Sequence, residues 1–529
     1  MPEDLYPSQL QQAFHGKKIN RRQFIRHLSA LGVSTALIPS FLAGTARAVE
    51  PKKGGHFRMG MGGGNTTDSL DSAVLADVVE MSTSYAIRNN LVEVDHRGLA
   101  QPELAESWDV SPKADRWAFN LRKDVEFHNG KSMDAQDVVY SITYHMGKNS
   151  KSGAKGLVDQ IVSVEAQGKH QVVFKLASGN ADFPYVLNDY HLVIVPAGTT
   201  GNEWEKGIGT GGYILEHWEP GVRSLLKRNP NYFKSNRAHF ESAEILTISD
   251  PNSRTNALRT GQLDYMNRVE LKTAHLFKRT PGVEILRVNG GRHYTLPMLT
   301  DVPPYTHNDL RLALKYAIDR EALVKKFLRG YGSVANDHPI PPMNKYFATE
   351  LPQRKYDPDK AAFHFKKAGV TQDIVLHASE LGNFMDVAAI FAHSAKGAGI
   401  NVKVKKQPGD GYWGNVWLKQ PFCTCYWGVR PTADMMFSVA YSGDAKWNDT
   451  HFKNPAFDKL VLGARAELDE AKRRAMYWDC QRILRDEGGT IIPFYIDYVE
   501  ALSTKVAHGP LSGLWETDSQ KAIERWWFA

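Results

Sequence analysis

Cysteine is scarce in this sequence, with only Cys423, Cys425 and Cys480 among 529 residues. So few thiols exclude the paired framework that stabilises small secreted domains, and we expect no disulfide scaffold. Cys423 and Cys425 would share one face of a strand, and Cys480 falls in a helical pattern. We therefore expect all three cysteines to be small, buried apolar side chains. A C-x-C pair without a matched histidine cluster is also weak evidence for a metal site.

Familiar catalytic motifs are also missing. The sequence has no G-x-S-x-G or H-E-x-x-H motif, and no S-x-x-K motif accompanied by its partner motifs. The 19 histidines are scattered, and His191, His293 and His451 lack regular ligand spacing. The glycines of residues 209–212 precede a strand pattern instead of a helix, which argues against a phosphate cradle. We therefore expect no enzymatic activity, no metal and no cofactor.

Long hydrophobic runs are absent too. The apolar stretch at residues 28–43 is broken by serine, threonine, glycine and proline, and is shorter than the roughly 20 residues that span a bilayer. Before it stand basic residues and the pair Arg21-Arg22 with Phe24, and residues 46–48 read as an A-x-A cleavage site. This pattern resembles the twin-arginine export signals, whose consensus is S/T-R-R-x-F-L-K and whose translocase carries folded cargo. The alternatives are an amphipathic helix or a membrane anchor.

The signal predicts a periplasmic protein that is cleaved near Ala48 and starts at Val49. Because no cysteine follows that site, we expect no lipid anchor. Without residues 1–48 the basic side chains fall from 65 to 59 and the acidic ones from 58 to 56, so the net charge drops from +7 to +3. A nucleic-acid partner is therefore not expected. The remaining chain of about 480 residues exceeds the size of one core, which predicts two or three lobes.

Strand and helix patterns alternate along the rest of the chain, without repeats or low-complexity tracts. Strand patterns occur at residues 117–121, 161–164, 171–176, 213–218, 374–377 and 402–405, and helix patterns at 134–142, 308–318 and 386–397. Ser132 is expected to cap the first of these helices. The alternation indicates an α/β protein.

Several ordered blocks resemble one family. They are the stretch from LAQPELAESW to DVVYSI at residues 99–142, GTGGY at 209–213, LLKRNPNYF at 225–233, NDLRLALKYAIDREALV at 308–324 and NPAFDKLVLGAR at 454–465. Together they make the chain from residue 55 to 529 similar to the family 5 extracellular solute-binding proteins, the receptors of peptide, nickel and opine ABC importers.

That resemblance implies a two-lobed, type II-like periplasmic-binding-protein fold with an extra α/β subdomain inserted in lobe one. Aligning the blocks gives residues 49–90, 206–290 and 500–529 for lobe one, 91–205 for the inserted subdomain and 291–499 for lobe two. A hinge would let the lobes close over a ligand. The partners implied are a small-molecule or peptide ligand, the permease subunits of an ABC importer in the inner membrane and, during export, the twin-arginine translocase. The receptor is expected to be a monomer.

At the expected ligand site the sequence departs from the peptide-binding relatives. Those relatives carry an aspartate in a W-x-x-D-like stretch that pairs with the peptide amine, and here Arg430 stands three residues after Trp427. A guanidinium favours a carboxylate, phosphate or sulfate, which it holds in bidentate fashion. Asp434 lies four residues further on and is a candidate for a ligand cation. The alternative is that Arg430 and Asp434 pair with each other or cap a local turn.

Aromatic and glycine residues complete the candidate site. Tyr412, Trp413, Trp427 and Trp447 stand near glycine and aspartate in loop-like stretches, where the clefts of α/β lobes form. Their faces are also suited to a quaternary ammonium, while burial against the lobe core is the alternative. Gly63 lies in a glycine-rich loop that family members bring to the pocket. Tyr294, with Arg292 and His293 beside the expected hinge, is a further candidate.

We interpret the sequence as that of a periplasmic receptor that captures a small organic solute by hinge closure and delivers it to an ABC permease. The solute is expected to be peptide-like or to be anionic or zwitterionic, such as an opine or amino-acid derivative. The alternatives are an ordinary di- or oligopeptide receptor or a nickel-chelate receptor, and a periplasmic enzyme or chaperone belongs to a different class.

Overall fold

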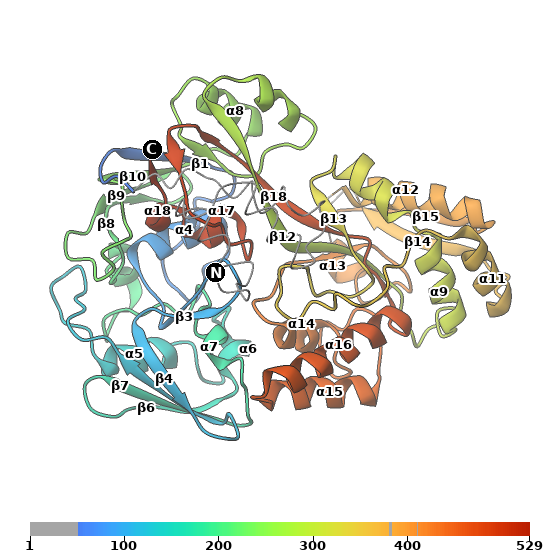
Figure 1. The fold of residues 1–529 in the computed structure, drawn as a ribbon, viewed down its shortest axis with the longest axis horizontal. Helices are drawn as coiled ribbons and strands as arrows, with labels where there is room; N and C mark the ends of the chain where they lie inside the picture. Colours follow the sequence, from blue (N-terminus) through green and yellow to red (C-terminus); the bar gives the residue numbers. More distant parts are fainter. Residues whose placement is uncertain (1–50, 380–382, 410) are drawn as a thin grey trace, which may run out of the picture. The chain divides into compact units, whose positions relative to one another are not determined.

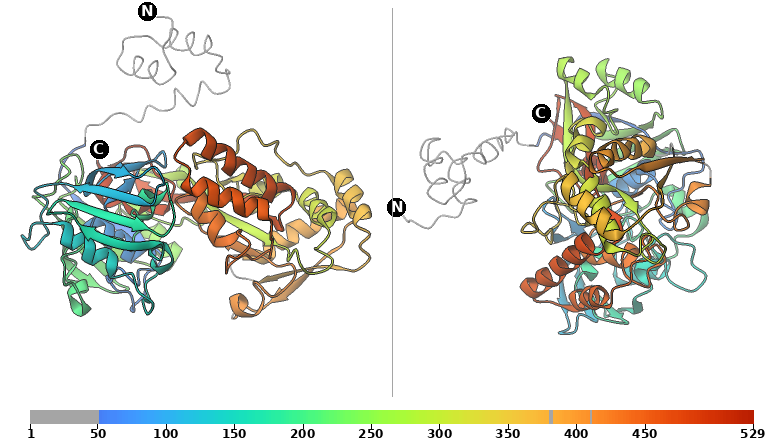
Figure 2. Two further views of the ribbon diagram at one scale, coloured as in Figure 1. Left: turned by 90° about the horizontal axis from the view of Figure 1, so that it is seen from below. Right: turned by 90° about the vertical axis from the view of Figure 1, so that its right-hand side faces the viewer.

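The computed structural model describes residues 51–379, 383–409 and 411–529. The predicted export signal at residues 17–48 lies outside this part of the chain. Within it, every helix is too short or too polar to cross a bilayer. Figures 1 and 2 show the chain from three directions.

The largest sheet has ten strands, and its first part forms what we call lobe one. At its centre β1 (His56–Met61) pairs in parallel with β10 (Ser242–Thr247) and with β11 (Tyr265–Met266). The antiparallel strands β9 (Arg223–Arg228) and β8 (Tyr213–Glu219) extend the sheet beyond β10. The predicted strand at 213–218 is thus confirmed. Alternate residues of β1 point into a core that includes Phe57, Met59, Tyr213, Ile245 and Trp526.

Two long strands continue this sheet toward the second lobe (Figure 1). These are β12 (Val283–Pro297) and β18 (Phe494–Ser503), which are antiparallel from Val283↔Ser503 to His293↔Tyr495. The register shifts between Val288 and Arg292. A Cβ atom on Gly290 would lie 2.4 Å from the Ile496 carbonyl oxygen, so the irregular stretch needs glycine there. The short strands β16 (Cys425–Trp427), β17 (Thr490–Ile491) and β13 (Gly332–Val334) complete the sheet.

A separate antiparallel sheet forms the subdomain, in the order β4 (Ala105–Val110), β5 (Arg116–Leu121), β7 (Gln171–Leu176) and β6 (Ile161–Ala166). The three strands predicted here are confirmed. Helix α5 (Ala135–Thr143) also forms as predicted, but the expected cap at Ser132 is wrong. The Asp134 side chain is the cap, because it accepts a hydrogen bond from the Gln136 amide and Asp137 closes a capping box.

Lobe two contains the β-α-β unit that the sequence predicts. Parallel strands β14 (Ile374–Ser379) and β15 (Val402–Gln407) are connected by α12 (Phe384–Ala395). The amphipathic helix α9 (Asn308–Ala317) packs with α11 (Pro358–Ala368). Helices α14 (Ala433–Ala440), α15 (Pro455–Ala466) and α16 (Glu470–Asp486) enclose a second core, which includes Cys425 and Cys480. All three cysteines are buried and free, as predicted.

Shorter elements connect these units. The α-helices are α4 (Val78–Ile87), α6 (Lys155–Val158), α7 (Phe183–Val186), α8 (Pro251–Arg259), α10 (Arg320–Ala322), α13 (Tyr412–Asn415) and α18 (Ala522–Arg525). The element labelled α17 (Glu516–Gln520) is a left-handed turn. The 3-10 and π turns are η1 (Gly201–Lys206), η2 (Ala274–Arg279), η3 (Leu323–Phe327) and η5 (Lys396–Ala398). Strands β2 (Val92–Val94) and β3 (Ala100–Pro102) pair with each other, as do β19 (Val506–Ala507) and β20 (Trp527–Phe528).

Candidate ligand-binding site

A cavity lies where the subdomain, lobe two and the segment before α17 meet. Its volume is about 40 Å³. Its walls are formed by Val94, His96, Gly98, Asp182, Tyr185, Pro341, residues 343–346, residues 429–432, Ser512 and Leu514. Ligand pockets in proteins usually measure about 300–1,000 Å³. An organic ligand therefore requires these walls to separate before it can enter.

Arg430 lines this cavity, in the turn between β16 and α14. Its Nη1 atom donates to the carbonyl oxygens of Gly428 (3.3 Å) and Val429 (3.2 Å). Among the described residues no carboxylate lies within ion-pair distance of its guanidinium. Burial lowers the pKa of Arg430 from its ordinary value, while Tyr190 and Asp189 oppose that change. Arginine keeps its charge even so, which leaves a cation without an acidic partner at the cavity wall.

The second predicted ligand contact, Asp434, has a protein partner. Arg465 Nε on α15 donates to both Asp434 carboxylate oxygens, at 3.0 and 3.1 Å. Burial raises the pKa of Asp434, and the charge of Arg465 opposes the rise. The alternative has two parts: pairing of Arg430 with Asp434 is wrong, because Asp434 pairs with Arg465, whereas contact of Arg430 with its own turn is confirmed. A ligand contact by Asp434 stays a prediction, and the residue lies outside the cavity wall.

Sequence reasoning missed most of the polar cavity residues, among them Asp182, Lys345 and Tyr346. Asp182 precedes α7, and its Oδ2 atom lies 2.6 Å from Nη2 of Arg473 on α16. The Lys345 ammonium lies 4.7 Å from the ring centre of Tyr346 and 5.7 Å from that of Tyr185. These residues come from segments distant in the sequence, so no local motif could have identified them as a group.

The predicted tryptophans form a cluster in lobe two. Trp413 and Trp447 are 40% and 48% exposed, whereas Trp427 is buried. Trp427 Nε1 donates to Asp449 Oδ2 at 3.2 Å, and Trp417 Nε1 donates to the same oxygen at 3.1 Å. Burial raises the pKa of Asp449 to about 6. Trp413 and Trp447 therefore present aromatic surface, while Trp427 serves the packing of the cluster.

The other candidates lie away from the cavity wall. Tyr412 is buried, and its hydroxyl donates to the Thr424 carbonyl oxygen at 2.9 Å. Tyr294 is buried in the lobe-two core, with its ring centre 5.3 Å from that of Phe384. Gly63 has φ +118° and stands close to Asp77, whose Oδ1 atom would be 2.7 Å from an added Cβ. Ligand contacts by these three residues stay predictions.

The other two residues noted beside the expected hinge differ in exposure. The Arg292 guanidinium is exposed and lies 4.7 Å from the ring centre of Tyr426, itself an exposed aromatic residue next to Trp427. His293 is buried with its Nδ1 atom 3.0 Å from the Gly291 carbonyl oxygen, and burial lowers its pKa to about 4. Arg292 is thus free to meet solvent, and His293 is not.

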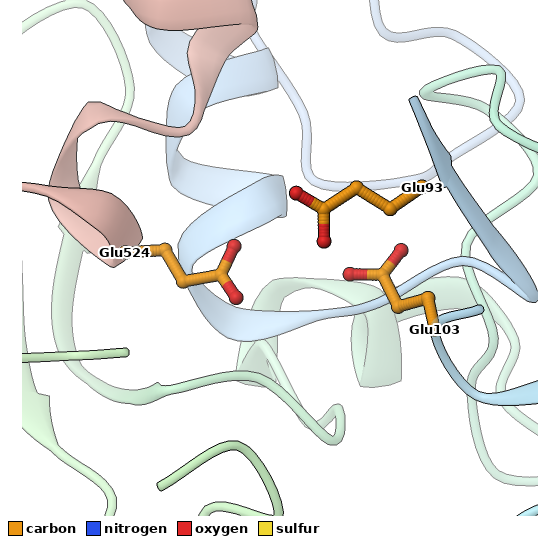
Figure 3. Close-up of side chains that lie close together, drawn as sticks. All are labelled: Glu93, Glu103 and Glu524. Carbon is orange, nitrogen blue, oxygen red and sulfur yellow. The ribbon is translucent and has the colours of Figure 1, made fainter. Parts of the chain in front are cut away.

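One acidic cluster among the described residues has the density of a metal site (Figure 3). The carboxylate oxygens of Glu93, Glu103 and Glu524 lie within 4.8 Å of one another. The Lys234 ammonium donates to all three carboxylates, at 2.9, 2.7 and 3.0 Å. Lys521 pairs with Glu103 and Arg525 with Glu93, so that with Lys234 three cations face the three carboxylates and the protein itself neutralises the cluster.

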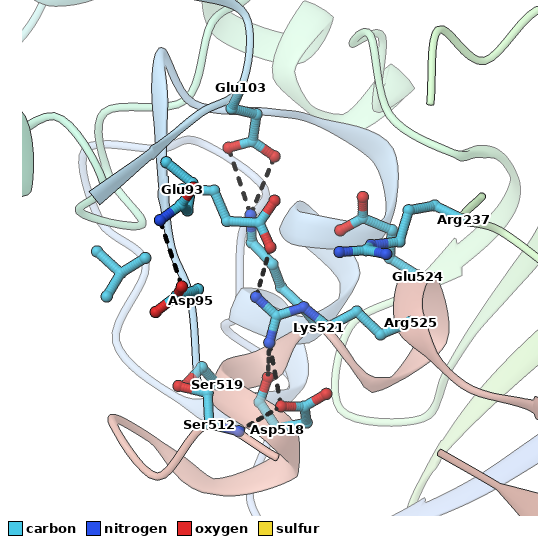
Figure 4. Close-up of polar contacts among 12 residues, drawn as sticks. Glu93, Asp95, Glu103, Arg237, Ser512, Asp518, Ser519, Lys521, Glu524 and Arg525 are labelled. Atoms are coloured by element: carbon cyan, nitrogen blue, oxygen red, sulfur yellow. Dashed lines mark hydrogen bonds and ion pairs between the residues drawn. The ribbon is translucent and has the colours of Figure 1, made fainter. Parts of the chain in front are cut away.

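The same cluster holds the C-terminal segment (Figure 4). Lys521 donates to Glu103 at 3.0 Å, and Arg525 bridges Glu93 at 2.6 Å and Asp518 at 3.0 Å. Asp518 also accepts from the backbone amide of Ser512 at 2.8 Å. Residues 517–520 all have positive φ, from 51° to 65°. This costly left-handed turn is fixed by the network and positions the segment whose Ser512 and Leu514 line the cavity.

Comparison with known proteins agrees with this architecture. The sequence matches the family described as bacterial extracellular solute-binding proteins, family 5 Middle, over residues 100–449. It is 26% identical over 499 residues to the periplasmic oligopeptide-binding protein OppA of Escherichia coli, covering 85% of this chain and 89% of OppA. The probable D,D-dipeptide-binding periplasmic protein DdpA of the same organism is 25% identical over 461 residues, covering 83% and 88%.

Solved structures show the fold. MppA, a periplasmic murein tripeptide binding protein in an unliganded open form, matches with a TM-score of 0.79 at 20% identity, over 90% of this chain and 97% of MppA. AgaA from A. tumefaciens R10, in complex with agropinic acid, matches with a TM-score of 0.73 at 23% identity, over 90% and 99%. The predicted two-lobed α/β fold is thus confirmed.

Proposed function

Because the chain belongs to the family 5 bacterial extracellular solute-binding proteins, we propose that it is a periplasmic receptor that captures a small organic anion for an ABC importer. Its relatives include receptors named for peptides and nickel and a structure with bound agropinic acid. The chemical class of the ligand follows from the residues that line the cavity of this chain.

The assignment of an anionic ligand depends on Arg430, which has no acidic partner among the described residues. The guanidinium lines the cavity, and no carboxylate of the described residues neutralises it. A partly buried cation without a counter-ion is costly, so an anionic ligand gains both a charge-assisted hydrogen bond and relief of that cost. A carboxylate or phosphate group suits the guanidinium, because both accept two parallel hydrogen bonds.

The proposed mechanism is closure of the two lobes around the ligand. The cavity is lined by residues of the subdomain, such as His96 and Asp182, and by residues of lobe two, such as Lys345 and Arg430. A ligand that contacts both groups at once requires them to be close together. Contacts made in the closed state alone shift the equilibrium toward closure. The irregular crossing of β12 and β18 at Gly290 is the expected hinge.

A ligand screen tests this function. The mature chain, residues 49–529, is heated with opines, amino-acid derivatives, sugar phosphates, peptides, betaines and nickel chelates, and the melting temperature is recorded. We expect stabilisation by compounds that carry a carboxylate or phosphate and no product formation. Turnover of any compound would instead indicate an enzyme, and stabilisation confined to cations would contradict the role of Arg430.

The second candidate function is that of an ordinary peptide receptor, because the relatives OppA and DdpA are named as peptide-binding proteins. This candidate requires a carboxylate for the peptide amine, and Asp434 is the residue that sequence comparison offers. Stabilisation by unmodified di- or oligopeptides together with loss of binding in Asp434→Asn would support it over the anion receptor.

The remaining proposals concern the route and the partners. Export through the twin-arginine translocase and cleavage near Ala48 are supported by the basic and apolar pattern of residues 17–48. The ligand-loaded receptor would pass its solute to permease subunits in the inner membrane. We propose that it acts as a monomer without catalytic activity, and a molar mass near that of one mature chain in light scattering would support this.

A further inference from the structure

We infer that the ligand is an anion whose recognition uses no free amine, such as an N-acylated amino acid or an amine-free carboxylate. This inference rests on the proposed function and narrows the ligand class. It follows from the protein partners of the carboxylates that surround the cavity.

Asp182 is the acidic residue among the described cavity-lining residues, and it is paired within the protein. Its carboxylate is 1% exposed and lies 2.6 Å from Arg473, whose side chain is 5% exposed. The backbone amide of the preceding residue, Ala181, donates to the Arg465 carbonyl oxygen at 2.7 Å. This contact holds the segment before α7 against lobe two and directs the Asp182 charge to Arg473.

The carboxylates behind the cavity wall are also paired. Asp434 accepts two hydrogen bonds from Arg465, and Asp189 lies 2.6 Å from Nδ1 of His191. Glu516, just beyond the cavity-lining Leu514, accepts hydrogen bonds from Arg268 at 2.9 and 3.1 Å. A ligand ammonium entering the cavity would thus compete with an existing arginine at Asp182, Asp434 and Glu516, and with an imidazole at Asp189.

The two cations at the cavity wall, Arg430 and Lys345, have no buried acidic partner among the described residues. Arg430 has only backbone carbonyl partners among the described residues. Lys345 also lines the cavity, and its nearest acid is Glu470 at 3.3 Å, a residue with a 55% exposed side chain. The wall therefore carries an excess of positive charge. Burying a ligand ammonium there without a free carboxylate is unfavourable, whereas an acylated or absent amine avoids that desolvation.

Matched ligand pairs test the inference by isothermal titration of the mature chain. The pairs are alanylalanine with N-acetylalanylalanine, alanine with N-acetylalanine, and aspartate with succinate. We expect the amine-free or acetylated member of at least one pair to bind at least tenfold more tightly than its partner. Tighter binding by the free-amine members would overturn the inference while leaving the receptor function in place.

Failure of the proposed function has a different signature. Binding only by neutral or cationic compounds from the wider screen would overturn both this inference and the role of Arg430, but not the receptor. Absence of binding by every compound in both experiments would count against the receptor itself and against this ligand class.

A variant pair tests Asp182, because neither of its carboxylate oxygens has a hydrogen-bond partner among the described residues. Its Oδ2 atom lies at ion-pair distance from Arg473, so Oδ1 is the place where an amine would compete. Asp182→Asn is compared with Arg473→Met, which removes the cation but keeps the carboxylate. We expect Asp182→Asn to change the affinity for both members of a pair by the same factor. We expect Arg473→Met to improve the relative affinity of the free-amine member. A tenfold selective loss of that member in Asp182→Asn would refute the inference.

Discussion

Arg430 is the side chain on which the ligand class depends, and its substitution separates binding from folding. Arg430→Ala should weaken binding of a carboxylate ligand by about a hundredfold, since a charge-assisted hydrogen bond contributes about 1.5–3 kcal/mol. Stability should not fall, because no described carboxylate depends on this guanidinium and removal of a largely buried, unpaired cation relieves its desolvation cost. Titration calorimetry and denaturant unfolding measure the two effects. Unchanged affinity, with the exposed Lys446→Ala as control, would refute the assignment.

The raised pKa of Glu500 makes the free energy of unfolding depend on pH. It is buried on β18, its Oε1 atom accepts from the Thr517 amide at 2.6 Å, and burial raises its pKa to about 8. The ordinary pKa is 4.5, so the protonated form is favoured by folding. Its contribution to the free energy of unfolding is complete below about pH 4.5 and is lost as the pH rises through about 8, by up to about 1.4 kcal/mol per unit.

Glu500→Gln should remove this slope. Urea unfolding between pH 5 and 8 is the measurement, and the exposed Glu487→Gln serves as control. If Glu500→Gln and the parent protein lose stability in parallel over this range, the buried protonated carboxyl is not the cause.

At the scale of elements, the buried cluster around Lys234 joins parts of the chain that have no sheet in common. Glu93 belongs to β2, Glu524 to α18 and Lys234 to the loop after β9. Lys234→Met would leave three carboxylates within 4.8 Å of one another. The expected loss of stability is about 3–5 kcal/mol, the usual effect of removing one partner from a buried ion pair.

A divalent cation should partly restore the stability that the Lys234→Met variant loses, because three converging carboxylates are suitable ligands for calcium or manganese. Thermal melts with and without calcium are the test, with Lys227→Met, on the exposed side of β9, as control. A calcium-dependent rise in the melting temperature is expected for Lys234→Met alone. Equal stability of the variant and the parent protein would contradict the neutralising role of Lys234.

The sequence predicts elements well where the pattern is local. The unit β14–α12–β15 was expected at residues 374–377, 386–397 and 402–405, and it forms within a few residues of those bounds. The cap of α5 was misplaced by two residues, because Asp134 and Asp137 together form a better capping box than Ser132 offers. Strand pairing across hundreds of residues, as between β12 and β18, leaves no such local pattern.

The site was predicted only in part for the same reason. Arg430 was identified from its place after Trp427, and it lines the cavity. Trp427 stands in a stretch that is typical of a cleft, yet its indole is buried and its N–H group donates a hydrogen bond to Asp449. Asp182 and Lys345 reach the cavity from segments more than 160 residues apart, and their roles depend on Arg473 and the tyrosines that they meet there.

At the scale of the whole molecule, the Asp182–Arg473 pair connects the subdomain to lobe two, and we expect it to favour the closed arrangement of the two. Asp182→Asn and Arg473→Met should each enlarge the radius of gyration of the ligand-free protein in small-angle scattering. Ligand affinity should fall about tenfold, because a smaller fraction of molecules then occupies the binding-competent state. Arg482→Met, on the exposed side of α16, is the control and should change neither quantity. Unaltered scattering in both variants would contradict this role.

The pairing of Glu103 with Lys521 also sets the timing of folding during synthesis, because 418 residues separate the two. At roughly 5–20 residues per second, the ribosome needs about 20 to 80 seconds to cover that interval. Throughout this time the nascent lobe one lacks the ammonium of Lys521 and the guanidinium of Arg525. Until both cations emerge, Lys234 is the partner that Glu93 and Glu103 share. The final packing of this lobe is therefore a late event that follows synthesis of the C-terminal segment.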